Sequence, residues 1–176
     1  EFRRVLFRSG DLTYAVVVSD VGESRMAAYR RICEFLIEGW RSLDIELVYG
    51  DGGRGYIHNP NCFATATGAD LVLPNGVKLI GSAQLRRDRS ILQHGSILLE
   101  PDVELFARVF GEEAPGEVLE SLQGLSSKIS ARGEALRRMV VEALVEAAGR
   151  CFDAVFAVEP LSEGEWEAIA NFRRQR

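Results

Sequence analysis

The sequence predicts an α+β fold, a β-sheet with helices packed on one side. Apolar, β-branched runs typical of strands lie before Glu100, and apolar residues at three- and four-residue steps, typical of helices, dominate after it. The dipeptide Asn75-Gly76 separates two strand-like runs and is a strong hairpin signal. Strands early and helices late favour a sheet covered by helices on one face.

The first hundred residues are expected to supply the sheet and one helix. Ser24 is placed to cap that helix, because a serine side chain can accept from the backbone N–H groups of the first turn. The expected elements are, in order, a buried strand over 12–19, a helix to about Leu43, a short strand over 45–49, a Gly- and Asn-rich loop over 50–60, strands over 71–73 and from Val77 onward, a charged turn over 86–89 and a strand over 91–99.

The remainder is expected to be mostly helical. Ser162 and Glu165 have the spacing of a capping box, in which each side chain bonds the other's backbone N–H. The expected elements are a helix from Pro101-Asp102 through Phe110, a helix over 116–122, a longer helix capped by Ser130 and ending at Gly149, a strand over 152–158 and a last helix after Ser162.

The composition is that of one globular domain. The chain has 176 residues and is 47% hydrophobic, yet no apolar run reaches the roughly 20 residues that cross a bilayer, so no membrane partner is expected. A net charge of -5 argues against a nucleic-acid partner, since phosphate binding needs a basic face. Three irregularly spaced cysteines do not form a disulfide framework, which favours the cytoplasm.

The N-terminal segment 1–9 is expected to lie outside the domain. It back-translates readily into a common sequencing-adapter sequence, which indicates an artefact of gene assembly. We therefore expect residues 10–176 to be a partial domain whose natural front is missing.

Cys62 and Lys78 are the candidate catalytic residues. Only Lys78 and Lys128 are lysines among the 21 basic residues, so an indifferent position would be expected to carry arginine. A slim ammonium can enter a tight site that excludes a planar guanidinium; the alternative is a lysine that protects an edge strand. Cys62 sits on a loop, and its thiolate would be a nucleophile; taken alone Cys62 would be assigned a buried structural role, but its neighbours favour the nucleophile. A thiol beside an ammonium is typical of acyl transfer through a thioester.

Small residues and a histidine follow Lys78. Gly81, Ser82 and Ala83 would let an acyl chain or a phosphate approach the backbone closely. His94, followed by Gly95, could accept the proton of an incoming amine or orient the thiol, or the segment 93–95 could be a structural turn.

The other chemical side chains have weaker interpretations. Asp70 could hold a magnesium ion or the attacking amine, or be an exposed carboxylate at a strand end. Cys33 and Cys151 are expected to be small core residues, and His58 a solvated loop residue. One cysteine and two histidines supply no metal site.

Residues 11–100 resemble the biotin/lipoate protein ligase superfamily, in particular its cysteine-dependent octanoyltransferases and lipoate–protein ligase family proteins. The resemblance is carried by the segments 12–18, Cys62-Phe63, 76–86 and 91–99. It implies a catalytic domain like that of class II tRNA synthetases and biotin ligase, with a mixed sheet backed by helices.

The resemblance also implies a role for each matching position. Cys62 would carry an octanoyl or lipoyl group as a thioester, and Lys78 would polarise the acyl carbonyl or stabilise the oxyanion. Gly81, Ser82 and Ala83 would line the acyl tunnel, beside the substrate-binding candidates His94 and Gly95. The acceptor would be a lysine of a small carrier domain, as in glycine-cleavage H protein or a 2-oxoacid dehydrogenase E2. This transferase would need no cofactor.

Two alternatives stay open. One is a lipoate–protein ligase that uses ATP and Mg²⁺ through an acyl-adenylate, with Cys62 incidental. The other is an inactive fragment that binds lipoyl domains, because the family's Arg- and Gly-rich loop ahead of the first strand is missing here. The segment 64–68, Ala-Thr-Ala-Thr-Gly, also departs from the Pro-Ser type of better-known octanoyltransferases.

Overall fold

A computed structural model describes residues 10–51, 66–110 and 116–174. It contains a five-stranded sheet of order β1-β5-β4-β3-β2. The elements are β1 (Asp11–Ser19), α1 (Arg25–Ser42), β2 (Val48–Tyr49), β3 (Leu71–Val72), β4 (Lys78–Arg87), β5 (Ser90–Leu98), α2 (Val103–Phe110), α3 (Gly116–Ile129), α4 (Gly133–Phe152) and α5 (Glu163–Arg174).

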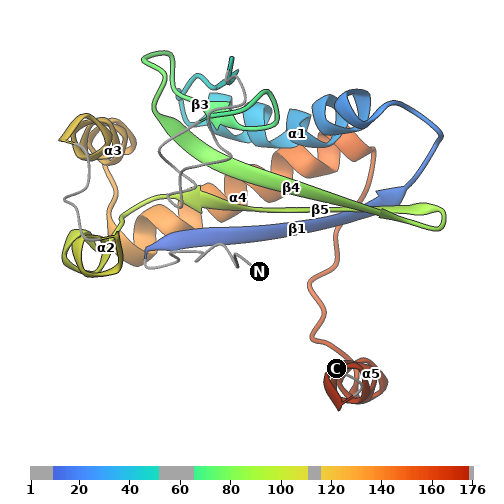
Figure 1. Cartoon of the computed structure of the whole chain (residues 1–176). Coiled ribbons are helices and arrows are strands. Elements are labelled where there is room, and N and C mark those ends of the chain that lie inside the picture. The colour runs from blue at the N-terminus through green and yellow to red at the C-terminus, as the bar shows by residue number, and fades with distance from the viewer. Residues whose placement is uncertain (1–9, 52–65, 111–115, 175–176) are drawn as a thin grey trace.

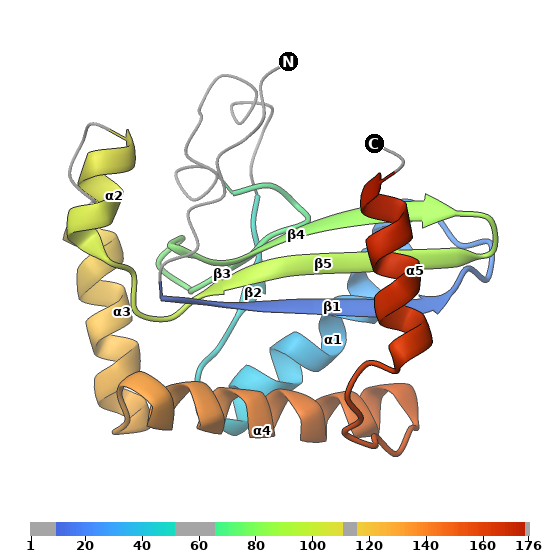
Figure 2. The ribbon, with the colours of Figure 1, turned by 90° about the horizontal axis from the view of Figure 1, so that it is seen from below.

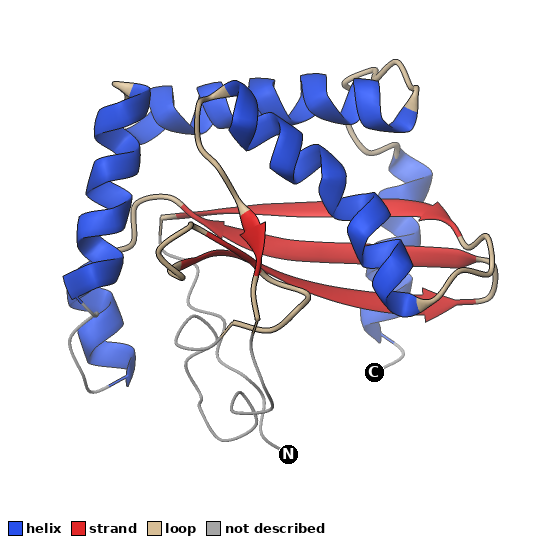
Figure 3. Ribbon diagram, turned by 90° about the horizontal axis from the view of Figure 1, so that it is seen from above, coloured by secondary structure: helices blue, strands red, loops and turns tan. Residues whose placement is uncertain are grey.

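The α+β prediction is confirmed, and α1 and α4 cover one face of the sheet (Figures 1 and 3). All four strand pairings in the described ranges are antiparallel, whereas a mixed sheet was expected. Tight turns explain this for β3–β4 and β4–β5, because parallel strands need a long crossover connection. Gly76 takes a positive φ of 89° in the predicted Asn-Gly turn.

The core lies between the sheet and the helix pair. Trp40 and Leu36 of α1 and Val140 of α4 are fully buried there. The two helices approach closely at Gly39, where a Cβ atom would lie 2.7 Å from Leu144 Cδ2. Glycine at this position therefore permits the contact between α1 and α4.

Helix α5 lies on the opposite side of the sheet from α1 and α4 (Figures 1 and 2). It begins with the predicted capping box: Ser162 N–H donates to Glu165 Oε2 at 2.8 Å, and Glu165 N–H donates to Ser162 Oγ at 3.3 Å. None of the helices in the described ranges combines the length and apolar character that a bilayer crossing requires.

Two predicted elements after Glu100 are wrong. Ser130 does not cap α4; it takes a positive φ of 57° just after α3, and α4 begins at Gly133, whose N–H donates to the Glu100 carboxylate. The predicted strand over 152–158 is absent, because α4 continues to Phe152 and ends at Asp153 in the left-handed conformation. β-branched residues form a strand only where a neighbouring strand pairs with them.

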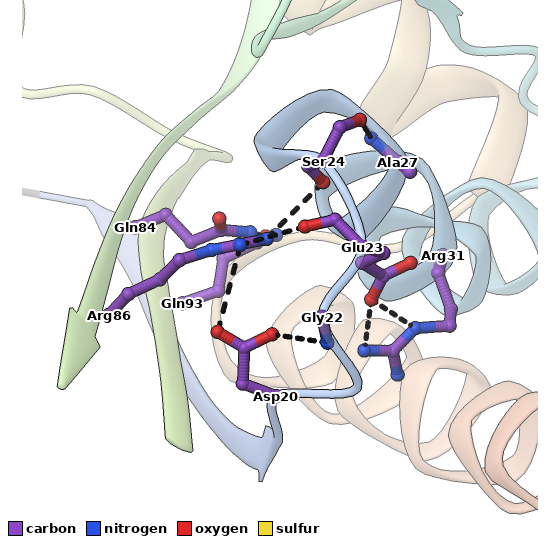
Figure 4. Close-up of polar contacts among 9 residues, drawn as sticks. All are labelled: Asp20, Gly22, Glu23, Ser24, Ala27, Arg31, Gln84, Arg86 and Gln93. Carbon is purple, nitrogen blue, oxygen red and sulfur yellow. Dashed lines mark hydrogen bonds and ion pairs between the residues drawn. The ribbon is translucent and has the colours of Figure 1, made fainter. Parts of the chain in front are cut away.

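Arg86 fixes the start of α1 to the far end of β4 (Figure 4). Its guanidinium donates to the backbone carbonyls of Glu23 at 2.8 Å and Ser24 at 3.2 Å, and lies 3.6 Å from the Asp20 carboxylate. Ser24 caps α1 as predicted, since its Oγ accepts from Ala27 N–H at 3.2 Å. One side chain thus bridges β4, the end of β1 and the first turn of α1.

Replacing Arg86 with alanine should lower the free energy of unfolding by about 1–3 kcal/mol, because a part-buried and an exposed carbonyl lose a charged donor that joins α1 to β4. Arg87→Ala is the matched control: its side chain is 81% exposed, and its pair with Asp88 at 3.7 Å should contribute less than about 0.5 kcal/mol. Urea denaturation measures both. Equal losses would contradict the bridging role of Arg86.

Candidate active site around Lys78 and Asp70

Lys78 and Asp70 form a buried ion pair where β4 begins. Lys78 Nζ lies 3.1 Å from Asp70 Oδ2, and the two side chains are only 8% and 6% exposed. Lys78 is therefore not a lysine that protects an edge, since β4 lies between β5 and β3. The interpretation of Asp70 as an exposed carboxylate is also wrong, because the side chain is buried and paired with Lys78.

Thr67 binds the same oxygen of the Asp70 carboxylate as Lys78 does. Its backbone N–H donates to Asp70 Oδ2 at 2.7 Å and its hydroxyl donates to the same oxygen at 2.9 Å. Asp70 N–H in turn donates to the Thr67 carbonyl at 2.9 Å, which closes a reciprocal turn. Thr67 was not among the predicted site residues, although the Thr-x-x-Asp spacing is the signal of such a local side-chain-to-backbone turn.

Gly81 leaves the space that the Lys78 side chain occupies. A Cβ atom at Gly81 would lie 3.1 Å from Lys78 Cε, 3.4 Å from its Nζ and 3.8 Å from Asp70 Oδ1. The ion pair therefore lies over the face of the sheet toward which a side chain at Gly81 would point. Lys78, Asp70 and Gly81 form one cluster, which we call the lysine site.

The remaining substrate-binding candidates divide between the two faces of the sheet. Ala83 pairs with His94 across β4 and β5, and both are exposed on the same face as Gly81, away from α1 and α4. Ser82 pairs with Gly95, and both face α1. The split follows from the two-residue period of strands, which turns neighbouring side chains to opposite faces. His94 lies within β5, so the alternative of a turn at 93–95 is wrong.

Ser82 belongs to a polar network between the sheet and α1. Its Oγ shares a hydrogen bond of 2.7 Å with Tyr14 Oη, and its carbonyl accepts from Tyr29 Oη at 3.4 Å. Gln93, which is fully buried, donates through Nε2 to Tyr14 Oη and to Cys33 Sγ, each at 3.2 Å, and accepts from Gln84 at 3.0 Å. The network ties β1, β4 and β5 to α1.

The absence of a side chain at Gly95 leaves room for the Tyr14 ring in this network. A Cβ atom at Gly95 would lie 2.7 Å from Tyr14 Cε1 and 3.2 Å from its Cζ. Such a contact is too short for a ring to tolerate without moving. In the described residues, Gly95 thus permits the packing of the Tyr14 ring on the face of the sheet that is covered by α1.

Burial changes the acidity of two members of this network. Desolvation raises the pKa of the Cys33 thiol to about 11, and it raises the pKa of the Tyr14 hydroxyl well above its usual value. The Cys33 thiol therefore stays protonated at neutral pH, and a protonated thiol is a poor nucleophile. This agrees with the prediction that Cys33 is a core residue.

Cys62 and His58 lie outside the described residues. Within the described ranges, no group of three or more His, Cys, Asp and Glu side chains is placed to hold a metal ion. Of the predicted catalytic and substrate-binding residues, the structure brings Lys78 and Gly81 together. Asp70 completes this cluster.

Solved structures with the same architecture are lipoate–protein ligases. Lipoate-protein ligase A, crystallised with ATP, matches with a TM-score of 0.71 at 18% identity, over 95% of this chain and 62% of the other. A bipartite lipoate protein ligase from Thermoplasma acidophilum, studied with its E2 lipoyl domain, matches with a TM-score of 0.62 at 20% identity, over 95% and 60%. The fold is that of a lipoate–protein ligase catalytic domain.

The chain belongs to the biotin/lipoate A/B protein ligase family, whose model matches residues 2–102. It is 36% identical to octanoyltransferase LipM of Symbiobacterium thermophilum over 78% of this chain and 53% of that protein. It is 30% identical to octanoyltransferase LipM of Anoxybacillus flavithermus over 97% of this chain and 71% of that protein. The chain thus spans about half the length of the first of these relatives.

Tyr14→Phe should lower the free energy of unfolding by about 1–3 kcal/mol, because Gln93 and Ser82 each lose a hydrogen-bond partner in the interior. Tyr49→Phe is the matched control, since the Tyr49 hydroxyl donates to the Arg30 carbonyl at 3.4 Å in an exposed place. It should change the free energy by less than about 0.5 kcal/mol. Thermal and urea unfolding measure both, and a Tyr14→Phe loss as small as the control would contradict the network.

The raised pKa of Cys33 predicts a loss of stability at alkaline pH. The folded state keeps the thiol proton to about pH 11 and the unfolded state releases it near 9.0, so the contribution is complete below pH 9 and falls as the pH rises to 11. The loss should be about 2–3 kcal/mol over that window. Cys33→Ala should remove this part of the pH dependence, and urea denaturation at pH 8 to 11 tests it. Parallel curves for the two proteins would contradict it.

Proposed function

We propose that the protein is an acyltransferase of protein lipoylation. It moves an octanoyl or lipoyl group, held as a thioester on Cys62, to a lysine of a carrier domain such as glycine-cleavage H protein or a 2-oxoacid dehydrogenase E2. The observation that carries the proposal is the buried Lys78–Asp70 pair over Gly81. The family membership and the relatives named octanoyltransferase support it.

The proposed reaction has two steps. The Cys62 thiolate attacks the acyl carbonyl of a thioester donor, and the C–S bond to the donor breaks with release of the donor as its thiolate. The amine of the acceptor lysine then attacks the Cys62 thioester, expels the thiolate and loses a proton to form the amide. Negative charge develops on the carbonyl oxygen in both steps.

Lys78 is the residue we assign to that charge. An ammonium fixed at one place stabilises an oxyanion without having to reorganise, and a single donor of this kind contributes about 10²–10³-fold in rate. Asp70 keeps the ammonium in place, and the missing side chain of Gly81 leaves space for the Lys78 side chain. Ala83 and His94 would border the acyl group on the same face of the sheet.

An ATP-dependent lipoate–protein ligase is the second candidate function, because lipoate-protein ligase A crystallised with ATP shares the fold. ATP and Mg²⁺ are proposed only for this candidate. Pyrophosphate release that depends on ATP would identify it. The relatives above 30% identity favour the transferase.

The free thiols of Cys33 and Cys151 fit the reducing cytoplasm, which we propose as the location of the protein.

The test is formation of an octanoyl adduct on Cys62. The protein is incubated with octanoyl-carrier protein and its intact mass is measured before and after hydroxylamine, which cleaves thioesters. Cys62→Ser should abolish the adduct, and Lys78→Met should slow transfer to a lipoyl domain about 10²–10³-fold. Cys151→Ala should keep both activities.

Octanoyltransferase LipM of Bacillus cereus, a 34% identical relative, serves as the positive control for the reagents. A Cys62→Ser protein that still forms a hydroxylamine-labile adduct would overturn the thioester assignment. Carrier-domain binding without any transfer would support the inactive binder instead.

A further inference from the structure

We propose that Thr67 is a positioning residue for Lys78 and that it acts through Asp70. The inference rests on the proposed function in one respect, namely that Lys78 is the group that faces the reacting carbonyl. The contacts themselves are independent of the reaction.

Thr67 and Lys78 meet at a single atom. Asp70 Oδ2 accepts from Thr67 N–H at 2.7 Å and from Thr67 Oγ1 at 2.9 Å, and Lys78 Nζ lies 3.1 Å away from it. A carboxylate oxygen with two fixed donors cannot rotate away from the ammonium. The position of the ammonium therefore depends on the hydroxyl of Thr67.

Thr67 is itself held rigidly. Its Oγ1 accepts from Ala69 N–H at 3.3 Å while it donates to Asp70, so the hydroxyl rotor has one orientation. The Asp70 carbonyl accepts from Gly50 N–H at 3.0 Å, and a Cβ atom at Gly50 would lie 2.9 Å from the Thr67 carbonyl oxygen. Gly50 thus packs directly on the Thr67–Asp70 turn, which ties the turn to the chain after β2.

Gly81 also limits where the ammonium can lie, since a Cβ atom there would be 3.4 Å from Lys78 Nζ and 3.8 Å from Asp70 Oδ1. Lys78 Cε and Nζ pack over its Cα, with no room for one added carbon at normal distance. The Lys78 side chain packs against Gly81 and is paired with Asp70, so a small displacement of the carboxylate is transmitted to the ammonium. Stabilisation of an oxyanion is sensitive to such displacements.

The lysine content of the chain permits a direct measurement. Lys78 and Lys128 are the only lysines, and Lys128 is half exposed, so selectively labelled lysine yields two side-chain NMR signals that are easily assigned. In the wild type the Lys78 ammonium protons should exchange slowly with water. Thr67→Val, which keeps the shape and removes the hydroxyl, should shift the Lys78 signals and speed this exchange about tenfold. The Lys128 signals should not move.

Two variants control for the substitution. Thr67→Ser restores the hydroxyl and should restore the Lys78 signals. Thr13→Val makes the same chemical change on β1, two strands from β4, and should leave them unchanged. Unaltered Lys78 signals in Thr67→Val, or signals that Thr67→Ser does not restore, would overturn the proposal.

A reciprocal variant decides the question if Thr67→Val does not fold. Lys78→Met should shift the Thr67 amide signal, because both groups bind Asp70 Oδ2, whereas Lys128→Met should leave it in place. An unshifted Thr67 amide in Lys78→Met would also overturn the proposal.

The transfer assay then separates this inference from the proposed function. If the protein transfers octanoyl groups, Thr67→Val should lower kcat about tenfold and leave KM for the donor unchanged. A changed KM with an unchanged kcat would contradict positioning. If the wild type transfers nothing, the proposed function fails, and the NMR result still decides the role of Thr67.

Discussion

Removing an ammonium and a carboxylate from water costs several kcal/mol per ion, so the Lys78–Asp70 pair persists only because its surroundings compensate for it. Two donors from Thr67 bind one oxygen of the carboxylate, and the missing side chain of Gly81 leaves space for the ammonium. An apolar pair of the same volume would be easier to bury. A charged pair at the start of a central strand is therefore better explained by a use for its charge than by stability.

The two-residue period of β4 gives the sheet two different surfaces. Gly81 and Ala83 lie on the face with the lysine site, whereas Ser82 and Gln84 lie against α1 in the network around Gln93. The run of small residues therefore has two tasks: Gly81 leaves space for the Lys78 side chain, and Ser82 ties the strand to α1 through Tyr29. Gly95 serves the second task, since the Tyr14 ring occupies the place of its side chain.

Features with a local physical cause could be predicted from the sequence, whereas features that depend on distant contacts could not. The Ser24 cap, the Asn75-Gly76 turn and the Ser162 capping box depend on a few neighbouring residues, and each was predicted. Whether 152–158 became a strand depended on a partner strand, and whether Asp70 was buried depended on how β3 and β4 pack; neither is encoded in nearby residues. Lys78 and Gly81 were identified as site residues from their residue types. That Gly81 and Ser82 face opposite sides of the sheet became clear only from the pairing of β4 with β5.

The strong arginine bias of the chain makes the identity of residue 78 informative in the light of this packing. Lys78 Nζ already lies 3.4 Å from where a single added carbon at Gly81 would be, and 3.1 Å from Asp70 Oδ2. A guanidinium is planar and wider, and it would have to displace either the Gly81 backbone or the carboxylate held by Thr67. The same geometry that confines the ammonium therefore selects lysine over arginine.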